Sequence, residues 1–203
     1  MISIGHSHPH YVEKLGAQLQ ELGFYSNSIK NPLQEELAGK LKKAANITDY
    51  SLFLCNSGAE ANENALKLAS FHTGKSNVIY FENAFHGRTS AAVAVTDNEG
   101  IKAPINKAQS VCKIAFEDIS GLEEELKKGE AAAVIIEFIQ GVGGLDEAST
   151  EFYQKTAALC EQYNAVLIAD EVQAGYGRTG DFFAYQKHKI RPGIISIAKG
   201  MGN

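Results

Sequence analysis

The sequence has little cysteine, and the few cysteines stand far apart. There are three, Cys55, Cys112 and Cys160, and no two of them form a CxxC pair. Small secreted domains rely on dense disulfides, and structural zinc sites need closely spaced ligands, so both classes are excluded. Cysteine usage of this kind fits a protein of the reducing cytoplasm.

The sequence also lacks a block of lysine or arginine and a long apolar run. Its formal net charge is −5 at pH 7, so it offers no basic surface for the phosphate backbone of nucleic acid. No apolar run approaches the roughly 20 residues that span a bilayer. The first residues, 1–6, lack the basic start and apolar core of a signal peptide. We therefore expect neither a nucleic-acid nor a membrane partner, and a cytoplasmic location.

Short apolar runs alternate with segments of helical period, a pattern typical of a largely parallel sheet covered by helices. Ser120 and Thr150 are suitable N-caps for two of these helices. The expected strands are 51–55, 78–82, 111–116, 132–139, 165–170 and 193–198. The expected helices are 34–45, 59–72, 120–128 and 150–163. The chain of 203 residues is thus predicted to be α/β and long enough for a substantial core.

Two of the expected strands end in reactive side chains. Lys199 closes the run 193–198, where we expect its amine to be held out of water. A desolvated lysine amine is a nucleophile that can form a Schiff base. Asp170 closes another run, and a desolvated carboxylate requires a cation or hydrogen bonds. The alternatives are a surface lysine and an acid that only caps the next helix.

A third expected strand, 51–55, leads into Asn56-Ser57-Gly58-Ala59 at the start of a helix. Ser57 and Glu60 have the spacing of a capping box. The small residues Gly58 and Ala59 let backbone amides approach an anion at the positive end of the helix. An ordinary helix start is the alternative, and Glu60 would repel a phosphate unless it folds back onto the helix end.

Together these strand ends offer an amine, a carboxylate and an anion cradle at one edge of an open sheet, where ligands collect. Pyridoxal phosphate carries a matching aldehyde, ring nitrogen and phosphate. Phe85 can stack on a flat ring, and Arg88 offers a fork for a carboxylate. A packed phenylalanine beside a surface arginine is the alternative for this pair.

Two other patterns are weaker evidence for a binding site. Gly175–Gly180 matches GxGxxG, but four residues separate it from the preceding strand, whereas a dinucleotide site needs an immediate strand-to-helix turn. His6, His8 and His10 alternate as metal ligands can, yet Pro9 favours an extended or turning surface segment. We expect no metal site.

Several blocks stand in an order that spacing alone does not explain. They are 56–63 (Asn-Ser-Gly-Ala-Glu-Ala-Asn-Glu), 85–89 (Phe-His-Gly-Arg-Thr), Glu137 with Gln140-Gly141, 170–180 (beginning Asp-Glu-Val-Gln-Ala-Gly) and 198–200 (Ala-Lys-Gly). In these blocks the chain resembles the class III aminotransferases, and among them the enzymes that act on an N-acylated ornithine. The resemblance runs from Gly5 to the last residue.

The resemblance implies the aspartate-aminotransferase architecture, fold type I of the pyridoxal-phosphate enzymes, with a mostly parallel mixed sheet. Residues 1–203 would form part of the large cofactor domain, truncated at both ends, with the small domain largely absent. It also implies a homodimer that transfers the side-chain amine of acetyl- or succinyl-ornithine to 2-oxoglutarate in arginine biosynthesis. Ornithine, 4-aminobutyrate and diaminopelargonate aminotransferases remain alternatives, as do an inactive fragment and a nucleotide-binding module at Gly175–Gly180.

Carried over residue by residue, the resemblance makes Lys199 the Schiff-base lysine and the proton carrier. Asp170 would bind the ring nitrogen, Val172 and Phe85 would cover the two ring faces, and Gln173 would lie near the phenolic oxygen.

The same resemblance implies a phosphate site at Gly58 and Ala59, with Ser57 beside them. Arg88 would meet the substrate carboxylate, and Glu137 would also belong to the substrate site.

One loop departs from the family pattern. Where relatives typically have Glu-Pro-(Val/Ile)-Gln-Gly-Glu, this chain has Phe138 in place of the proline and Val142 in place of the second glutamate. The loss of a negative charge at residue 142 predicts that a succinyl group on the donor is accepted as well as, or better than, an acetyl group.

Overall fold

The computed structural model describes residues 2–23 and 29–203. The chain divides into two compact units, Met1–Phe53 together with Asn203, and Leu54–Gly202. Within the described ranges, no helix is both long and apolar enough to cross a membrane.

The first unit contains two helices, α1 (Pro9–Glu21) and α2 (Pro32–Ala45). The expectation of an extended or turning segment at His6, His8 and His10 is wrong in part, because Pro9 stands in the first turn of α1. Proline fits that position, since its fixed φ is helical and its missing N–H would have no intrahelical partner. The described residues hold no group of three or more side chains suited to bind a metal ion.

Helix α2 confirms the expected helix 34–45 and starts two residues earlier. Asn31 caps it by accepting a hydrogen bond from the Leu33 amide, 2.9 Å away. Asn46 ends the helix in the left-handed conformation, with φ of +53°.

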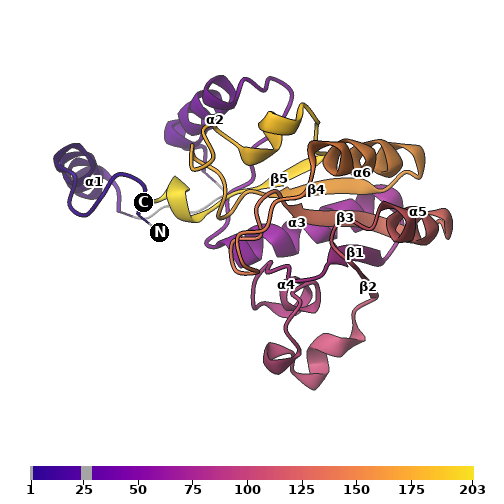
Figure 1. The fold of residues 1–203 in the computed structure, drawn as a ribbon. Helices are drawn as coiled ribbons and strands as arrows, with labels where there is room; N and C mark the ends of the chain where they lie inside the picture. The colour runs from indigo at the N-terminus through magenta and orange to yellow at the C-terminus, as the bar shows by residue number, and fades with distance from the viewer. Residues whose placement is uncertain (1, 24–28) are drawn as a thin grey trace. The chain divides into compact units, whose positions relative to one another are not determined.

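The second unit is built on a five-stranded parallel sheet with the order β2-β1-β3-β4-β5 (Figure 1). The direction of strand addition reverses between β1 and β3, and the strands' carboxyl ends next to such a reversal are where ligands bind in α/β folds. The strands are β1 (Asn77–Phe81), β2 (Val111–Ile114), β3 (Ala131–Glu137), β4 (Val166–Asp170) and β5 (Ile194–Ser196). These confirm five of the expected strands.

The helices of this unit cover the sheet because its two faces are both apolar. Helix α3 packs Leu66 against a cluster that includes Tyr80 and Ile135, whose side chains share one face of the sheet. On the other side Phe152 of α6 makes an edge contact with Phe81, with ring centroids 5.5 Å apart. The α-helices are α3 (Gly58–Thr73), α4 (Ser90–Ala94), α5 (Ile119–Lys127) and α6 (Thr150–Gln162). Short 3-10 turns lie at 99–101, 104–108, 184–188 and 199–201.

Three expectations need correction. Residues 51–55 form no strand, because an apolar run becomes a strand only where a neighbouring strand supplies hydrogen bonds, and Phe53 is 64% exposed. Asp118, not Ser120, caps α5, and Ser149, not Thr150, caps α6. In both cases an earlier residue with a suitable side chain starts the helix.

The cap of α5 can be tested by a matched pair of substitutions. The Asp118 carboxylate accepts a hydrogen bond from the Gly121 amide at 2.9 Å. We expect Asp118→Ala to lower the free energy of unfolding by about 1 kcal/mol, the usual cost of losing an N-cap. Ser120→Ala, at an exposed position, should leave it unchanged within about 0.5 kcal/mol. Urea unfolding measures the free energy of unfolding of both variants. Equal values for the two variants would refute the assignment of Asp118 as the cap.

Candidate active site

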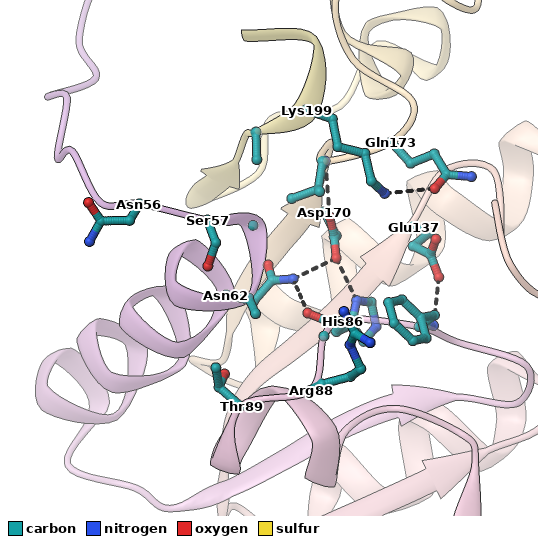
Figure 2. Close-up of a pocket in the computed structure, with 16 residues that line it drawn as sticks. Asn56, Ser57, Asn62, His86, Arg88, Thr89, Glu137, Asp170, Gln173 and Lys199 are labelled. Atoms are coloured by element: carbon teal, nitrogen blue, oxygen red, sulfur yellow. Dashed lines mark hydrogen bonds and ion pairs between the residues drawn. The ribbon is translucent and has the colours of Figure 1, made fainter. Parts of the chain in front are cut away.

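A cavity of about 550 Å³ opens at the carboxyl ends of the sheet strands (Figure 2). Its walls come from the start of α3, the segment after β1, the ends of β3 and β4, and the turn after β5. Every site residue expected from the sequence lines it. These residues are Ser57, Gly58, Ala59, Phe85, Arg88, Glu137, Asp170, Val172, Gln173 and Lys199. Figure 2 shows Lys199 and Asp170 facing the same space.

Asp170 is a buried acid of the cavity wall, at 4% exposure. Its Oδ2 accepts hydrogen bonds from Asn62 Nδ2 at 2.7 Å and from His86 Nδ1 at 2.8 Å. Its Oδ1 accepts one from the Val172 amide at 3.0 Å. A buried carboxylate needs such donors to offset lost hydration. One lone pair on Oδ1 remains for a further donor.

The sequence did not reveal Asn62 and His86 as partners of this acid. Both side chains are buried, and Asn62 Nδ2 also donates to the His86 carbonyl at 2.7 Å. His86 stands beside Phe85 in the block 85–89, whose aromatic ring and arginine predict contacts with a ligand. The histidine within this block is the signal that the sequence offers, but its partner cannot be predicted from spacing, because Asp170 lies 84 residues away.

Lys199 lies on the cavity but is not held out of water, which corrects the sequence-based expectation. Strand β5 ends at Ser196, so the lysine belongs to a following 3-10 turn and is exposed. Its backbone takes a φ of +43°, a left-handed conformation that is uncommon for a side-chain-bearing residue. Its Nζ donates a hydrogen bond to Gln173 Oε1 at 2.7 Å.

The start of α3 has the predicted cap with one change. Ser57 Oγ accepts from the Glu60 amide at 3.2 Å, and Glu60 Oε2 accepts from the Asn56 amide at 2.7 Å, one residue before the expected N-cap amide. The charge of Glu60 is therefore folded back onto the backbone. A Cβ at Gly58 would lie 2.6 Å from Val172 Cγ1, so only glycine allows this helix end to contact the turn after β4.

The segment after β1 is irregular and is held by side chains of other elements. Glu63 of α3 accepts hydrogen bonds from Thr89 Oγ1 at 2.8 Å and from the Ala91 and Ala92 amides at 2.9 Å. Gly87 has a φ of +136°, and a Cβ there would lie 2.7 Å from Ala59 Cβ. The exposed Arg88 stands between these anchors, on the rim of the cavity.

Glu137, at the end of β3, has both carboxylate oxygens occupied by backbone donors. Oε1 accepts from the Phe85 amide at 2.9 Å, and Oε2 from the Gly141 amide at 3.2 Å. Burial raises the pKa of the Glu137 carboxyl above its ordinary value and nearby Asp170 acts in the same direction, while His86 and these amides oppose the shift.

Glu171 fixes the turn that carries Val172 and Gln173. Its carboxylate accepts hydrogen bonds from the Ala184 amide at 3.0 Å and the Tyr185 amide at 2.9 Å. The residue is fully buried, and this burial raises its pKa to about 7. This role could not be predicted from the sequence, because Ala184 and Tyr185 lie 13 and 14 residues further along the chain.

The loop that departs from the family pattern has a buried end and an exposed tip. Phe138 is 1% exposed and packs on Tyr153 and His188, with ring centroids 4.7 and 5.7 Å apart. Val142 is 61% exposed and, within the described ranges, is not a lining residue of the cavity. The GxGxxG match at Gly175–Gly180 lies in a run of turns that leads to a short 3-10 turn at 184–188 and not directly into an α-helix, so it lacks the context of a dinucleotide site.

Comparison with known proteins places this site in a family. The family model described as Aminotransferase class-III matches residues 1–203. Acetylornithine aminotransferase of Bacillus cereus is 42% identical over 202 residues, which cover 99% of this chain and 52% of that protein. The enzyme of the same name from Archaeoglobus fulgidus is 42% identical over 203 residues and is covered to 53%. The chain spans about half the length of the curated relatives it matches.

Solved structures give the same result for the fold. N-acetylornithine aminotransferase from Stenotrophomonas maltophilia K279a is 35% identical, with a TM-score of 0.81 over 98% of this chain and 51% of that one. Ornithine aminotransferase from Toxoplasma gondii is 29% identical, with a TM-score of 0.86 over 95% of this chain and 47% of that one. The fold described above is therefore that of fold type I aminotransferases.

The buried acid Glu171 predicts a pH dependence of stability. Because its pKa is raised from 4.5 to about 7 in the folded state, the folded protein keeps this proton to a higher pH than the unfolded chain. The free energy of unfolding should therefore fall as pH rises from about 4.5 to about 7, by roughly 3 kcal/mol from this residue.

Glu171→Gln removes the titrating group, so the decrease should be smaller by that amount. Urea unfolding at pH 5, 6, 7 and 8 measures it. Glu161→Gln, at an exposed position of α6, is the control and should keep the wild-type dependence. If the free energy of unfolding had the same pH dependence in the wild type, Glu171→Gln and Glu161→Gln, the prediction would be contradicted.

Proposed function

The chain belongs to the class III aminotransferase family, and from that premise we propose that its protein transfers the side-chain amine of an N-acylated ornithine to 2-oxoglutarate, in arginine biosynthesis. The observation that carries the proposal is that Lys199, Asp170 and the start of α3 line the same cavity. The similarity to acetylornithine aminotransferases supports the choice of donor.

The residues of the cavity fit pyridoxal phosphate as the cofactor. Lys199 offers an amine, Asp170 offers a buried carboxylate with acceptor capacity left on Oδ1, and the start of α3 offers backbone amides. The cavity of about 550 Å³ also suits a ligand of this size. When bound, this cofactor supplies an electron sink for the pair of electrons left at the substrate Cα.

The proposed roles of the residues around the ring follow from their chemistry. Lys199 would hold the aldehyde carbon and later move a proton at the substrate Cα. Asp170 would hold the proton of the ring nitrogen, because a buried carboxylate favours a neighbouring cation. Phe85 and Val172 would exclude water from the ring faces, and Gln173 would orient the Lys199 amine as well as the phenolic oxygen.

The remaining walls would bind the charged ends of cofactor and substrate. Ser57, Gly58 and Ala59 would hold the phosphate through the amides at the start of α3. Arg88 would bind a substrate carboxylate, and Glu137 would belong to the wall of the same substrate site.

We also propose that the whole protein is a cytoplasmic homodimer, in which residues 1–203 form part of the large cofactor domain. The similarity along the whole chain to relatives that are about twice as long supports the partial domain, and the family resemblance and the sparse cysteines support the homodimer and the location. A second candidate is ornithine aminotransferase activity, which the similarity to the Toxoplasma gondii enzyme favours.

The cofactor proposal predicts a specific covalent capture. The purified protein, mixed with pyridoxal phosphate and reduced with borohydride, should carry the cofactor's mass on the peptide that contains Lys199. Lys199→Arg keeps the positive charge but cannot form the bond, so it should show no adduct. Mass spectrometry of the digested protein makes the test. An adduct at another lysine, or none, would remove the basis of the proposal.

The donor proposal predicts a particular substrate preference. Because Val142 stands where relatives typically have a glutamate, the full-length protein should turn over succinyl-ornithine at least as well as acetyl-ornithine with 2-oxoglutarate. Val142→Glu should shift the ratio of kcat/KM toward acetyl-ornithine by a factor of about two to five, since residue 142 is 61% exposed and a like charge there costs roughly 0.5–1 kcal/mol after screening by solvent. Glutamate release measures both rates. A strong wild-type preference for acetyl-ornithine would count against this prediction, and a preference for free ornithine would favour the second candidate.

A further inference from the structure

We propose that Glu137 is a positioning residue that clamps the backbones of Phe85 and Gly141, and so sets two walls of the cavity, a role that rests on the proposed function of that cavity. This differs from direct contact between its carboxylate and the substrate.

The geometry of the carboxylate carries the inference. One oxygen accepts the Phe85 amide at 2.9 Å and the other accepts the Gly141 amide at 3.2 Å. The first amide belongs to the segment after β1 and the second to the loop after β3, so one side chain joins two segments more than 50 residues apart. Glu137 is 5% exposed, and each of its two carboxylate oxygens already accepts a backbone amide.

The chemistry explains why an acid stands there. An amide or hydroxyl side chain cannot accept with two separate oxygens, whereas a carboxylate can satisfy two backbone donors at once. Hydrogen bonds to a charged acceptor are stronger than neutral ones. The cost of burying the charge is evident in the raised pKa of Glu137, so the site retains an acid that burial alone would disfavour.

The clamp reaches the proposed ring site from two directions. Phe85 is the proposed stacking residue, and its own amide is the held group. On the other side, a Cβ at Gly141 would lie 2.0 Å from Gln173 Nε2, so the Gly141 backbone is in direct contact with the side chain that accepts from Lys199 Nζ. Glu137 therefore helps to position Phe85 directly, and Lys199 through Gly141 and Gln173.

The same two segments also meet outside the clamp. Gln140 Nε2 donates to the Glu82 carbonyl at 2.7 Å, and a Cβ at Gly143 would lie 2.5 Å from the Asn83 carbonyl oxygen. Loss of the Glu137 contacts should therefore loosen the Phe85 and Gly141 amides without unfolding the unit.

The test uses Glu137→Gln in the full-length protein. Glutamine has the same shape, but its one NH₂ group must face one of the two amides, so one hydrogen bond becomes a contact between donors. Glu82→Gln is the matched control, because Glu82 is exposed and lies on the same segment as Phe85. Hydrogen–deuterium exchange is measured first, without cofactor or substrate, on peptides that contain residues 84–88 and 139–143. Pyridoxal-phosphate binding and its induced circular dichroism follow, again without substrate.

If Glu137 is a clamp, amides in these two peptides exchange at least about tenfold faster in Glu137→Gln and not in Glu82→Gln. The dissociation constant of pyridoxal phosphate rises about tenfold, as expected for the loss of about 1.4 kcal/mol. The dichroism of the bound cofactor changes before any substrate is added. With substrates, kcat falls for every donor alike.

The inference is overturned if exchange and dichroism stay at the wild-type level while KM for the amino donor alone rises, because that pattern is the signature of a substrate contact. Should Glu137→Gln not fold, Glu137→Asp, which keeps the charge and withdraws it by one methylene, undergoes the same measurements with the same two outcomes. A wild-type protein that binds no pyridoxal phosphate refutes the proposed function, while the exchange measurement still decides whether the two amides depend on Glu137.

Discussion

The structure around the cavity depends on one buried charge, the carboxylate of Asp170 at the end of β4. An isolated carboxylate at this depth would lose several kcal/mol of hydration, so donors must be brought to it. Asn62 comes from α3, His86 from the segment after β1, and the Val172 amide from the turn after β4. Satisfying this one group therefore fixes three segments against the end of the strand, and these segments are walls of the cavity (Figure 2).

The same solution recurs around the site, where acids serve as acceptors for backbone amides. Glu63 caps α4, Glu137 joins two loops, and Glu171 holds the start of the 3-10 turn at 184–188. Irregular segments leave backbone donors that no helix or strand satisfies. A carboxylate satisfies two of them in a defined geometry, which gives loops the rigidity that a binding site requires. Helix and sheet hydrogen bonds alone could not position Phe85 or Gln173.

The sequence predicted the strands of the sheet well because fully buried parallel strands are continuous apolar runs, as in β3. It failed at 51–55, because an apolar run does not reveal whether a partner strand is present. It also failed for the environment of Lys199, because the backbone leaves β5 before the apolar run ends. The motifs did bring every expected site residue to one cavity.

What the sequence could not give is the set of side chains that hold the motifs in place. Asn62 and Asp170 are 108 residues apart, and His86 and Asp170 are 84 apart. Local periodicity carries no information on contacts at that separation, since they depend on how the helices pack on the sheet. Partners of this kind emerge only once the strand order is known.

The two departures from the family pattern in the loop after β3 have different physical consequences. Phe138 replaces a residue that would fix the backbone, and its ring instead anchors the loop in an aromatic core with Tyr153. The Tyr153 hydroxyl also donates to the Phe138 carbonyl at 3.1 Å. Val142, in contrast, lies at the exposed tip, where a change of charge affects no packed neighbour of the cavity wall. The tip is still held by its backbone, because a Cβ at Gly143 would lie 2.5 Å from the Asn83 carbonyl oxygen, so the Val142 side chain can vary while the loop keeps its position. A buried anchor and an exposed side chain on one loop are thus consistent with a cavity lined by all ten expected residues although residue 142 differs in charge.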